Sequence, residues 1–211
     1  MLGFSKALPV PYYVQPTDIT CQSTCLKMFA AYLEERLMVS TGAGERQIGD
    51  IWTDINIGTK RPVKARNAHA NMKWWLETHF PRVKFEYVTT VDSVAALSSI
   101  VGFIDKGFPV MMSVSHASVK GHIILVIGYE NYRPNQSSPD FSLVVHDPYG
   151  RFDPSLSERL FGKKRWDRGM SLMSGGESGP GANLRLPLDG VSRHRSGDAS
   201  RGTFYLLSAR H

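Results

Sequence analysis

Residues 15–38 read QPTDITCQSTCLKMFAAYLEERLM and carry the clearest structural signal in the chain. After Cys21 the apolar side chains recur at spacings of three and four, at Cys25, Met28, Phe29, Tyr32, Leu33 and Leu37. Such a period predicts a helix from Cys21 to about Met38 that buries one stripe of side chains. Thr20 directly precedes the helix and belongs to a residue type that caps helix N-termini.

Cys21, at the predicted start of this helix, is a candidate nucleophile. The positive end of a helix dipole and a nearby imidazolium both favour the thiolate form of a cysteine. Most free cysteines are instead small buried hydrophobes, and that interpretation fits Cys25, one turn further along the stripe. A disulfide between the two is not expected, because their spacing on a helix would strain it. With two cysteines in all and no histidine cluster, we expect no metal and no other cofactor.

The segments outward from this helix favour helices first and strands later. Three more helices are expected, over residues 47–55, 68–79 and 92–106, and five strands, over residues 83–90, 109–115, 122–130, 141–147 and 203–209. The expected inward positions of the later helices are Met72, Trp75, Leu76, Val94, Leu97, Val101 and Ile104. Because strands and helices do not alternate, this order predicts the α+β class, with N-terminal helices packed on an antiparallel sheet.

His122 opens one of the expected strands, HIILVIGYE, and follows a glycine. An imidazole at the head of a strand can project into a cleft, where it would act as the base for a thiol. A half-buried histidine with satisfied ring nitrogens is the alternative. His116, six residues earlier, is an alternative candidate for the base, but the position of His122 at the start of a strand favours His122.

Asp147 and Gln15 complete the set of candidate polar residues. Asp147 closes the next strand, FSLVVHD, and a carboxylate there would orient the imidazole of His122, although Asp-Pro is also a turn signal. His146 is expected to point to the opposite face of a regular strand. Gln15 lies six residues before Cys21, where its amide could help to hold an oxyanion together with the backbone N–H of Cys21.

Length and charge limit the organisation and the partners. The 211 residues predict a single domain over 1–211, with a long irregular, basic and Gly-rich insertion around residues 151–202 that could be a lid, a flap or a partner site. The net charge of +6 fits nucleic acid, anionic lipid, an anionic cell-wall polymer or simply a solvated basic loop. No zinc-finger or RNP-type motif accompanies the charge, so nucleic acid is not expected.

Targeting signals are also lacking in the sequence. No apolar run approaches the roughly 20 residues of a membrane span. The N-terminus, MLGFSKALPVPYYVQ, does not have the pattern of a signal peptide. We therefore expect a chain made in the cytoplasm that acts in the periplasm or outside the cell after delivery or lysis.

The segments VPYYVQ, CQSTCLKM, GFPVMMSV, GHIILVIGYE and VVHDPYG together resemble the C39-like papain-fold cysteine peptidases. The DPYG form is similar to that of phage-borne and bacterial cell-wall-associated members. The resemblance implies a papain-like fold, a triad of Cys21, His122 and Asp147, and Gln15 as the oxyanion residue. It also implies acyl transfer to the thiol followed by hydrolysis, with peptidoglycan stem peptides or leader peptides as substrates. Many relatives have Gly-Pro after the cysteine, whereas Gln22 and Ser23 follow it here.

Three functions fit these residues. The first is a cysteine hydrolase that cuts an amide in peptidoglycan peptides, as a lysis or tail enzyme or an antibacterial effector, with a delivery or immunity protein as a partner. The second is a transglutaminase-like or deamidase-like toxin, or a protease, that acts on a protein, since one triad serves each reaction. The third is an inactive papain-like binding module, which the presence of all four polar residues disfavours.

Overall fold

The computed structural model describes residues 3–17, 19–116, 119–134, 140–153, 165–167, 181–186 and 203–210. The helices are α1 (Cys21–Leu37), α2 (Ile48–Asn56), α3 (His69–His79) and α4 (Ser93–Asp105). The strands are β1 (Phe4–Ala7), β2 (Lys84–Thr90), β3 (Val110–His116), β4 (Val119–Tyr132), β5 (Ser142–His146), β6 (Arg151–Asp153), β7 (Arg165–Asp167), β8 (Leu184–Leu186) and β9 (Phe204–Arg210). The predicted α+β class, with an N-terminal helix on an antiparallel sheet, is confirmed.

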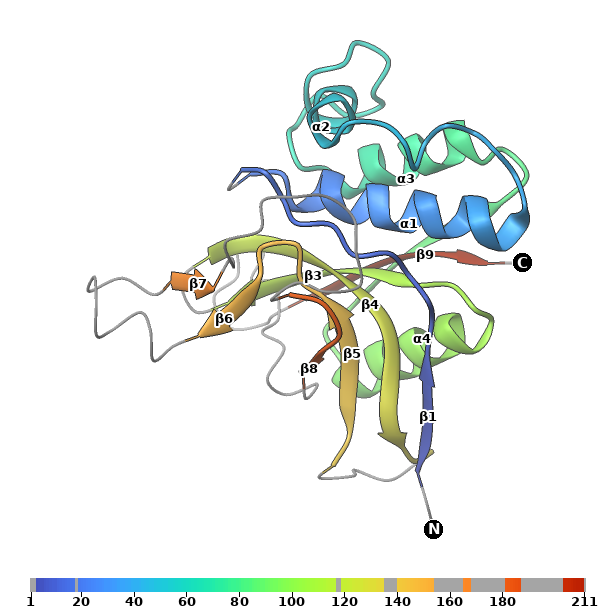
Figure 1. Ribbon diagram of the computed structural model, residues 1–211, viewed down its shortest axis with the longest axis vertical. Helices are drawn as coiled ribbons and strands as arrows, with labels where there is room; N and C mark the ends of the chain where they lie inside the picture. Colours follow the sequence, from blue (N-terminus) through green and yellow to red (C-terminus); the bar gives the residue numbers. More distant parts are fainter. Residues whose placement is uncertain are drawn as a thin grey trace.

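Helix α1 forms because its apolar stripe has a sheet to cover. Leu26, Phe29 and Leu33 are each 0% exposed, and Phe29 meets the ring of Phe85 on β2 edge to face. Burial of one such side chain stabilises a fold by about 1.5–3 kcal/mol. In Figure 1 α1, α2 and α3 lie together on one side of β9, and α4 lies on its other side.

A seven-stranded antiparallel sheet carries the helices, in the order β2-β9-β3-β4-β5-β8, with β1 paired to β4. Strand β4 is long enough to pair with β3, β5 and β1. Its register with β5 shifts between Val126 and Gly128, and a Cβ at Gly128 would collide with the backbone of Lys6 and Ala7. Glycine at this position therefore lets β1 approach the curved strand. Strands β6 and β7 form a separate pair.

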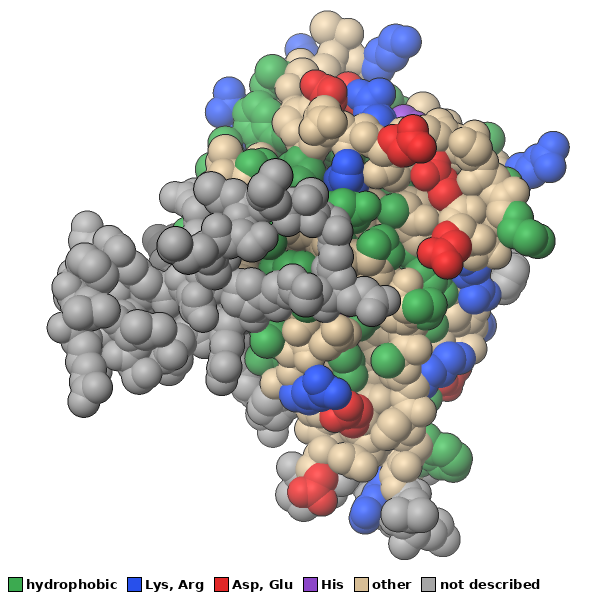
Figure 2. All heavy atoms as spheres, viewed as in Figure 1, with side chains coloured by type: hydrophobic (Ala, Val, Ile, Leu, Met, Phe, Trp, Pro, Cys, Tyr) green, Lys and Arg blue, Asp and Glu red, His purple; other side chains and the backbone are tan. Residues whose placement is uncertain are grey.

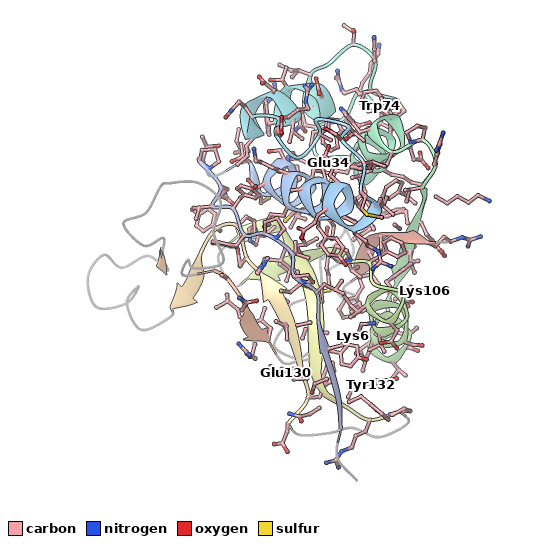
Figure 3. The ribbon with its side chains drawn as sticks, turned by 45° about the vertical axis from the view of Figure 1, so that its right-hand side comes forward. Lys6, Glu34, Trp74, Lys106, Glu130 and Tyr132 are labelled. Atoms are coloured by element: carbon pink, nitrogen blue, oxygen red, sulfur yellow. The ribbon has the colours of Figure 1, made fainter. Side chains whose placement is uncertain are left out.

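The ends of α1 are held by polar contacts. Thr20 stands at the N-cap, but its hydroxyl donates to the carbonyl of Thr17 rather than accepting from the helix, so the expected side-chain cap is wrong. At the other end, Met38 takes a left-handed φ of 52°. Glu34 then accepts hydrogen bonds from the backbone N–H groups of Thr41, Ala43 and Gly44, and so holds the turn that leads to α2 (Figure 3).

Other expectations need correction. Val94 is 73% exposed because it lies in the first turn of α4, whereas Val101 and Ile104 are buried as expected, together with Ala96 and Ile100. Strand β1 was not expected at all. The region around 151–202, expected to be irregular, contains the short strands β6, β7 and β8, and the rest of it lies outside the described residues.

Among the residues that the structure describes, no helix has the length and apolarity to cross a bilayer.

The connection between α2 and α3 is organised by one buried side chain, Asn71. This residue is 0% exposed. Its Nδ2 donates to the carbonyls of Ile55 at 2.8 Å and Val63 at 2.9 Å. Its Oδ1 accepts from the backbone N–H of Val63 at 3.0 Å. One buried amide thus provides hydrogen-bond partners for the backbone groups of Ile55 and Val63.

Replacing Asn71 by Ala is expected to lower the free energy of unfolding by about 2–4 kcal/mol, because these backbone groups lose their partners. Urea unfolding followed by circular dichroism measures the change. The control is Thr78→Ala on the same helix, where an exposed hydroxyl bonds only the carbonyl of Trp74 and the loss should stay within about 0.5 kcal/mol. Equal losses in the two variants would contradict this role of Asn71.

Candidate active site

Cys21 is the first residue of α1 and is 7% exposed. No acidic residue lies in the first turn of the helix, so the positive end of its dipole faces the thiol without an opposing charge. The Sγ lies 3.4 Å from Oε1 of Gln22, to which a protonated thiol would donate. The position suits a group that must become negatively charged during a reaction.

The side chains of His122 and Asp147 form a buried hydrogen-bonded pair. Nε2 of His122 lies 2.7 Å from Oδ1 of Asp147, and the two side chains are 2% and 1% exposed. Burial by itself lowers the pKa of His122, but the charge and hydrogen bond of Asp147 and a hydrogen bond to Cys21 raise it to about 10. Because Asp147 occupies Nε2, the nitrogen left for the thiol is Nδ1. The structure therefore brings together three of the four predicted residues.

Antiparallel pairing of β4 with β5 places this pair. Leu125 lies opposite His146, so Asp147, one residue beyond β5, is set beside the start of β4 where His122 stands. Oδ1 of Asp147 also accepts from the backbone N–H of Tyr149 at 2.9 Å, an Asx turn. The ring of Tyr149 meets the imidazole of His122 edge to face, with centroids 5.9 Å apart.

The backbone of Asp147 is held from two distant segments. Its N–H donates to the carbonyl of Gly181 at 2.8 Å, and its carbonyl accepts from the hydroxyl of Tyr12 at 3.0 Å. A Cβ at Gly181 would overlap the carbonyl oxygen of Asp147, so the close approach requires glycine. Burial and the charge of Asp147 raise the pKa of Tyr12, which keeps its phenol proton for this hydrogen bond.

His146, the neighbour of Asp147, is engaged elsewhere. Its Nδ1 accepts from the backbone N–H of Asn183 at 3.1 Å, and its Nε2 lies 2.9 Å from the carbonyl of Val10. A nitrogen that accepts a backbone N–H carries no proton, so this ring is neutral and donates through Nε2. Its different partners agree with the expectation that it points away from Asp147. The side chain of His116, the other competitor, lies outside the described residues.

Gln15 lies beside the pair through its backbone, since its N–H donates to the carbonyl of Pro148 at 2.8 Å. The side chain is 1% exposed, and Nε2 donates to the carbonyl of Thr17 at 2.6 Å. Oε1 has no hydrogen-bond partner among the described residues. In this arrangement the side chain binds Thr17 rather than the thiol, and one amide N–H remains for another acceptor.

Cys25 is a buried structural residue, as expected. It is 0% exposed, and its Sγ donates to the carbonyl of Ile123 at 3.5 Å. Burial, followed by the charges of Cys21 and Asp147, holds the pKa of the Cys25 thiol well above its usual range. Both cysteines are free of disulfides.

Sequence reasoning missed the residues that hold the predicted ones in place. Gln22 links Cys21 to Asn67, because its Nε2 donates to Oδ1 of Asn67 at 2.5 Å. The departure from Gly-Pro after the cysteine was the one signal for this contact. No local pattern pointed to Tyr12 or Gly181, because each acts on Asp147 from a distant part of the chain.

Within the part of the chain that the structure describes, no group of three or more His, Cys, Asp or Glu side chains is placed to hold a metal ion.

Comparison with known proteins gives one family. A search of curated proteins returns no significant match. The Peptidase_C39 like family matches residues 7–168, a span that contains the helix of Cys21 and the strands of His122 and Asp147. Since this match covers more than half of the 211 residues, the chain belongs to the C39-like peptidase family and is a cysteine hydrolase.

Proposed function

We propose that this hydrolase cleaves an amide bond in bacterial peptidoglycan peptides through an acyl-enzyme on Cys21. The observation that carries the proposed mechanism is the buried 2.7 Å bond between His122 and Asp147 beside a thiol at a helix N-terminus. The choice of wall peptide is supported by the net charge of +6 and a pI near 9.4, which favour an anionic polymer. Such an enzyme would act outside the cytoplasm, after delivery or lysis.

In the proposed first step the Cys21 thiolate attacks the carbonyl carbon of the scissile amide. The carbonyl oxygen takes up the negative charge, and the backbone N–H of Cys21 and the remaining amide N–H of Gln15 are its proposed donors. The imidazolium of His122 then donates its proton to the leaving nitrogen. The C–N bond breaks, the amine departs, and the acyl group stays on sulfur as a thioester.

In the second step water replaces the thiol. Neutral His122 accepts a proton from the attacking water, the C–S bond breaks, and the product leaves as a carboxylic acid. The proton on His122 and the thiolate on Cys21 restore the starting pair. Asp147 orients the ring throughout and stabilises its positive charge, without itself taking a proton.

Replacing Cys21 by Ala should abolish release of peptide fragments from purified peptidoglycan sacculi, because no thioester can form. Mass spectrometry of the soluble fragments gives the readout and identifies the bond. The matched control is Cys25→Ala, one turn along the same helix, which removes a buried thiol and should keep its activity with about 1 kcal/mol lost from stability.

Two outcomes would contradict the proposal. If the wild type left sacculi intact but cleaved a protein, it would be a cysteine protease with a protein substrate rather than a peptidoglycan hydrolase. A mass increase of about 1 Da on a protein, without cleavage, would identify a deamidase instead.

Asp147→Asn should move the basic limb of the pH profile of kcat/KM to lower pH. The wild-type limb is expected where His122 loses its proton, at about 10. Without the carboxylate charge, burial dominates and the pKa of His122 should fall below its ordinary value of about 6.5. Rates with a cleaved peptide between about pH 5 and 11 measure the shift.

The control for this shift is Glu130→Gln, which removes one carboxylate from the same strand, β4, and should leave the limb in place. The pair of His122 and Asp147 also stabilises the fold. Because the folded pKa of His122 is raised, its contribution is complete below the unfolded value of about 6.5 and is lost as the pH rises through about 10. Basic limbs at the same pH in wild type and Asp147→Asn would contradict the assigned pair.

A further inference from the structure

The connection between α2 and α3, residues 57–68, carries a concentrated positive charge and is here called the basic loop. It contains Lys60, Arg61, Lys64 and Arg66, and the sequence has no Asp or Glu from Ile55 to Leu76. Figure 2 shows Lys and Arg side chains projecting from the end of the molecule that carries α2. Lys60, Lys64 and Arg66 are exposed, and no salt bridge in the described part of the chain involves them.

The backbone of the basic loop is fixed by buried amides, so the charges stand on an ordered frame. Asn71 binds Val63 from both of its amide ends, as described above. Asn56, also 0% exposed, accepts from the backbone N–H of Asn67 at 2.7 Å. Arg61 donates to the carbonyls of Gly58 and Lys64. A solvated charge run without function has no need of this internal support, whereas a binding surface gains from preorganisation.

The frame is tied directly to the nucleophile. Gln22 is 3% exposed and contacts Cys21 through Oε1 and Asn67 through Nε2. Asn67 holds a left-handed φ of 58°, so the loop turns sharply where it touches the site. Two residues beyond Asn67, at the start of α3, Nε2 of His69 lies 2.6 Å from Oγ of Ser113, which fixes the same end of the loop to β3. The Asn67 end of the basic loop is therefore joined to the thiol through a single side chain, that of Gln22.

We propose that the basic loop is the recognition element for carboxylate groups on the peptide that Cys21 attacks. The side chains of Lys60, Lys64 and Arg66 bind these carboxylates. The inference rests on the proposed function, because it takes Cys21 as the nucleophile. It restricts the substrate to peptides with carboxylates close to the scissile bond. The guanidinium of Arg61 donates to carbonyls within the loop, so Arg61 stabilises the loop and is not proposed to bind the peptide.

Binding can be measured without cleavage in the Cys21→Ala protein. The probe is a fluorescent peptide rich in Glu, compared with its counterpart in which each Glu is Gln, by anisotropy at low salt. We expect the Glu peptide to bind about tenfold more tightly, as three exposed charge contacts would give. The triple variant Lys60→Gln, Lys64→Gln, Arg66→Gln should abolish this preference, and so should high salt.

A matched triple removes the same charge elsewhere. Arg82→Gln, Lys84→Gln, Lys106→Gln changes three exposed residues near the start of β2 and the end of α4, where Figure 3 labels Lys106. This variant should keep the preference for the Glu peptide. Equal binding of the two peptides, equal effects of the two triples, or tighter binding of a single-stranded oligonucleotide through the same loop would overturn the proposal.

Proximity to the thiol is tested in the wild type. Over short reaction times the Glu peptide should slow alkylation of Cys21 by iodoacetamide by about threefold or more, and the Gln peptide should not. Binding without protection would place the peptide away from the site and overturn the proposal. A protein that binds and is protected but cleaves nothing would retain the recognition loop while removing the proposed hydrolysis, so the two failures are distinguishable.

Discussion

The buried bond between Nε2 of His122 and Oδ1 of Asp147 is the interaction on which the rest of the site depends. Taking an imidazolium and a carboxylate out of water is costly, and their attraction offsets the cost only when the remaining lone pairs and protons are satisfied. Here Oδ1 has a second donor in the backbone N–H of Tyr149, and the thiol of Cys21 provides the other partner of the ring. The pair therefore orients a charged imidazole and, as long as the ring stays protonated, also contributes to the stability of the fold.

Holding that pair draws on parts of the chain that are far apart in sequence. Tyr12, from the segment that precedes α1, and Gly181, more than thirty residues beyond β5, both bind the backbone of Asp147. Antiparallel pairing of β4 and β5 supplies the register, and α1 presents the thiol at its positive end. The contact of Gln22 with Asn67 adds the α2–α3 connection to the same site. The proposed nucleophile and the proposed recognition loop are thus joined by one set of hydrogen bonds around the start of α1.

The sequence predicts those features that local periodicity controls. The apolar stripe of α1, the inward side chains of α3 and the central strands β3, β4 and β5 are all visible as spacings of three, four or two residues. The prediction that Val94 is buried is wrong, because the apolar stripe of α4 continues into a first turn whose side chains remain largely exposed. Strand β1 is mostly exposed and becomes a strand only through its pairing with β4, so it has no signal of its own. Cys21, His122, Asp147 and Gln15 were predicted from chemistry and motif order. The contacts from Gln22 to Asn67 and from Gly181 to Asp147 join distant residues, and they follow from the tertiary fold alone.

The most direct test of the account is the protonation state of His122, observed by nuclear magnetic resonance on isotope-labelled histidine nitrogens. Both ring nitrogens of His122 are expected to carry protons at neutral pH, and the ring is expected to titrate only as the pH approaches about 10. His146 offers the contrast within the same protein, with a proton on Nε2 and none on Nδ1. A His122 ring with one bare nitrogen at neutral pH, titrating near the ordinary value of about 6.5, would contradict the charged pair and the mechanism built on it.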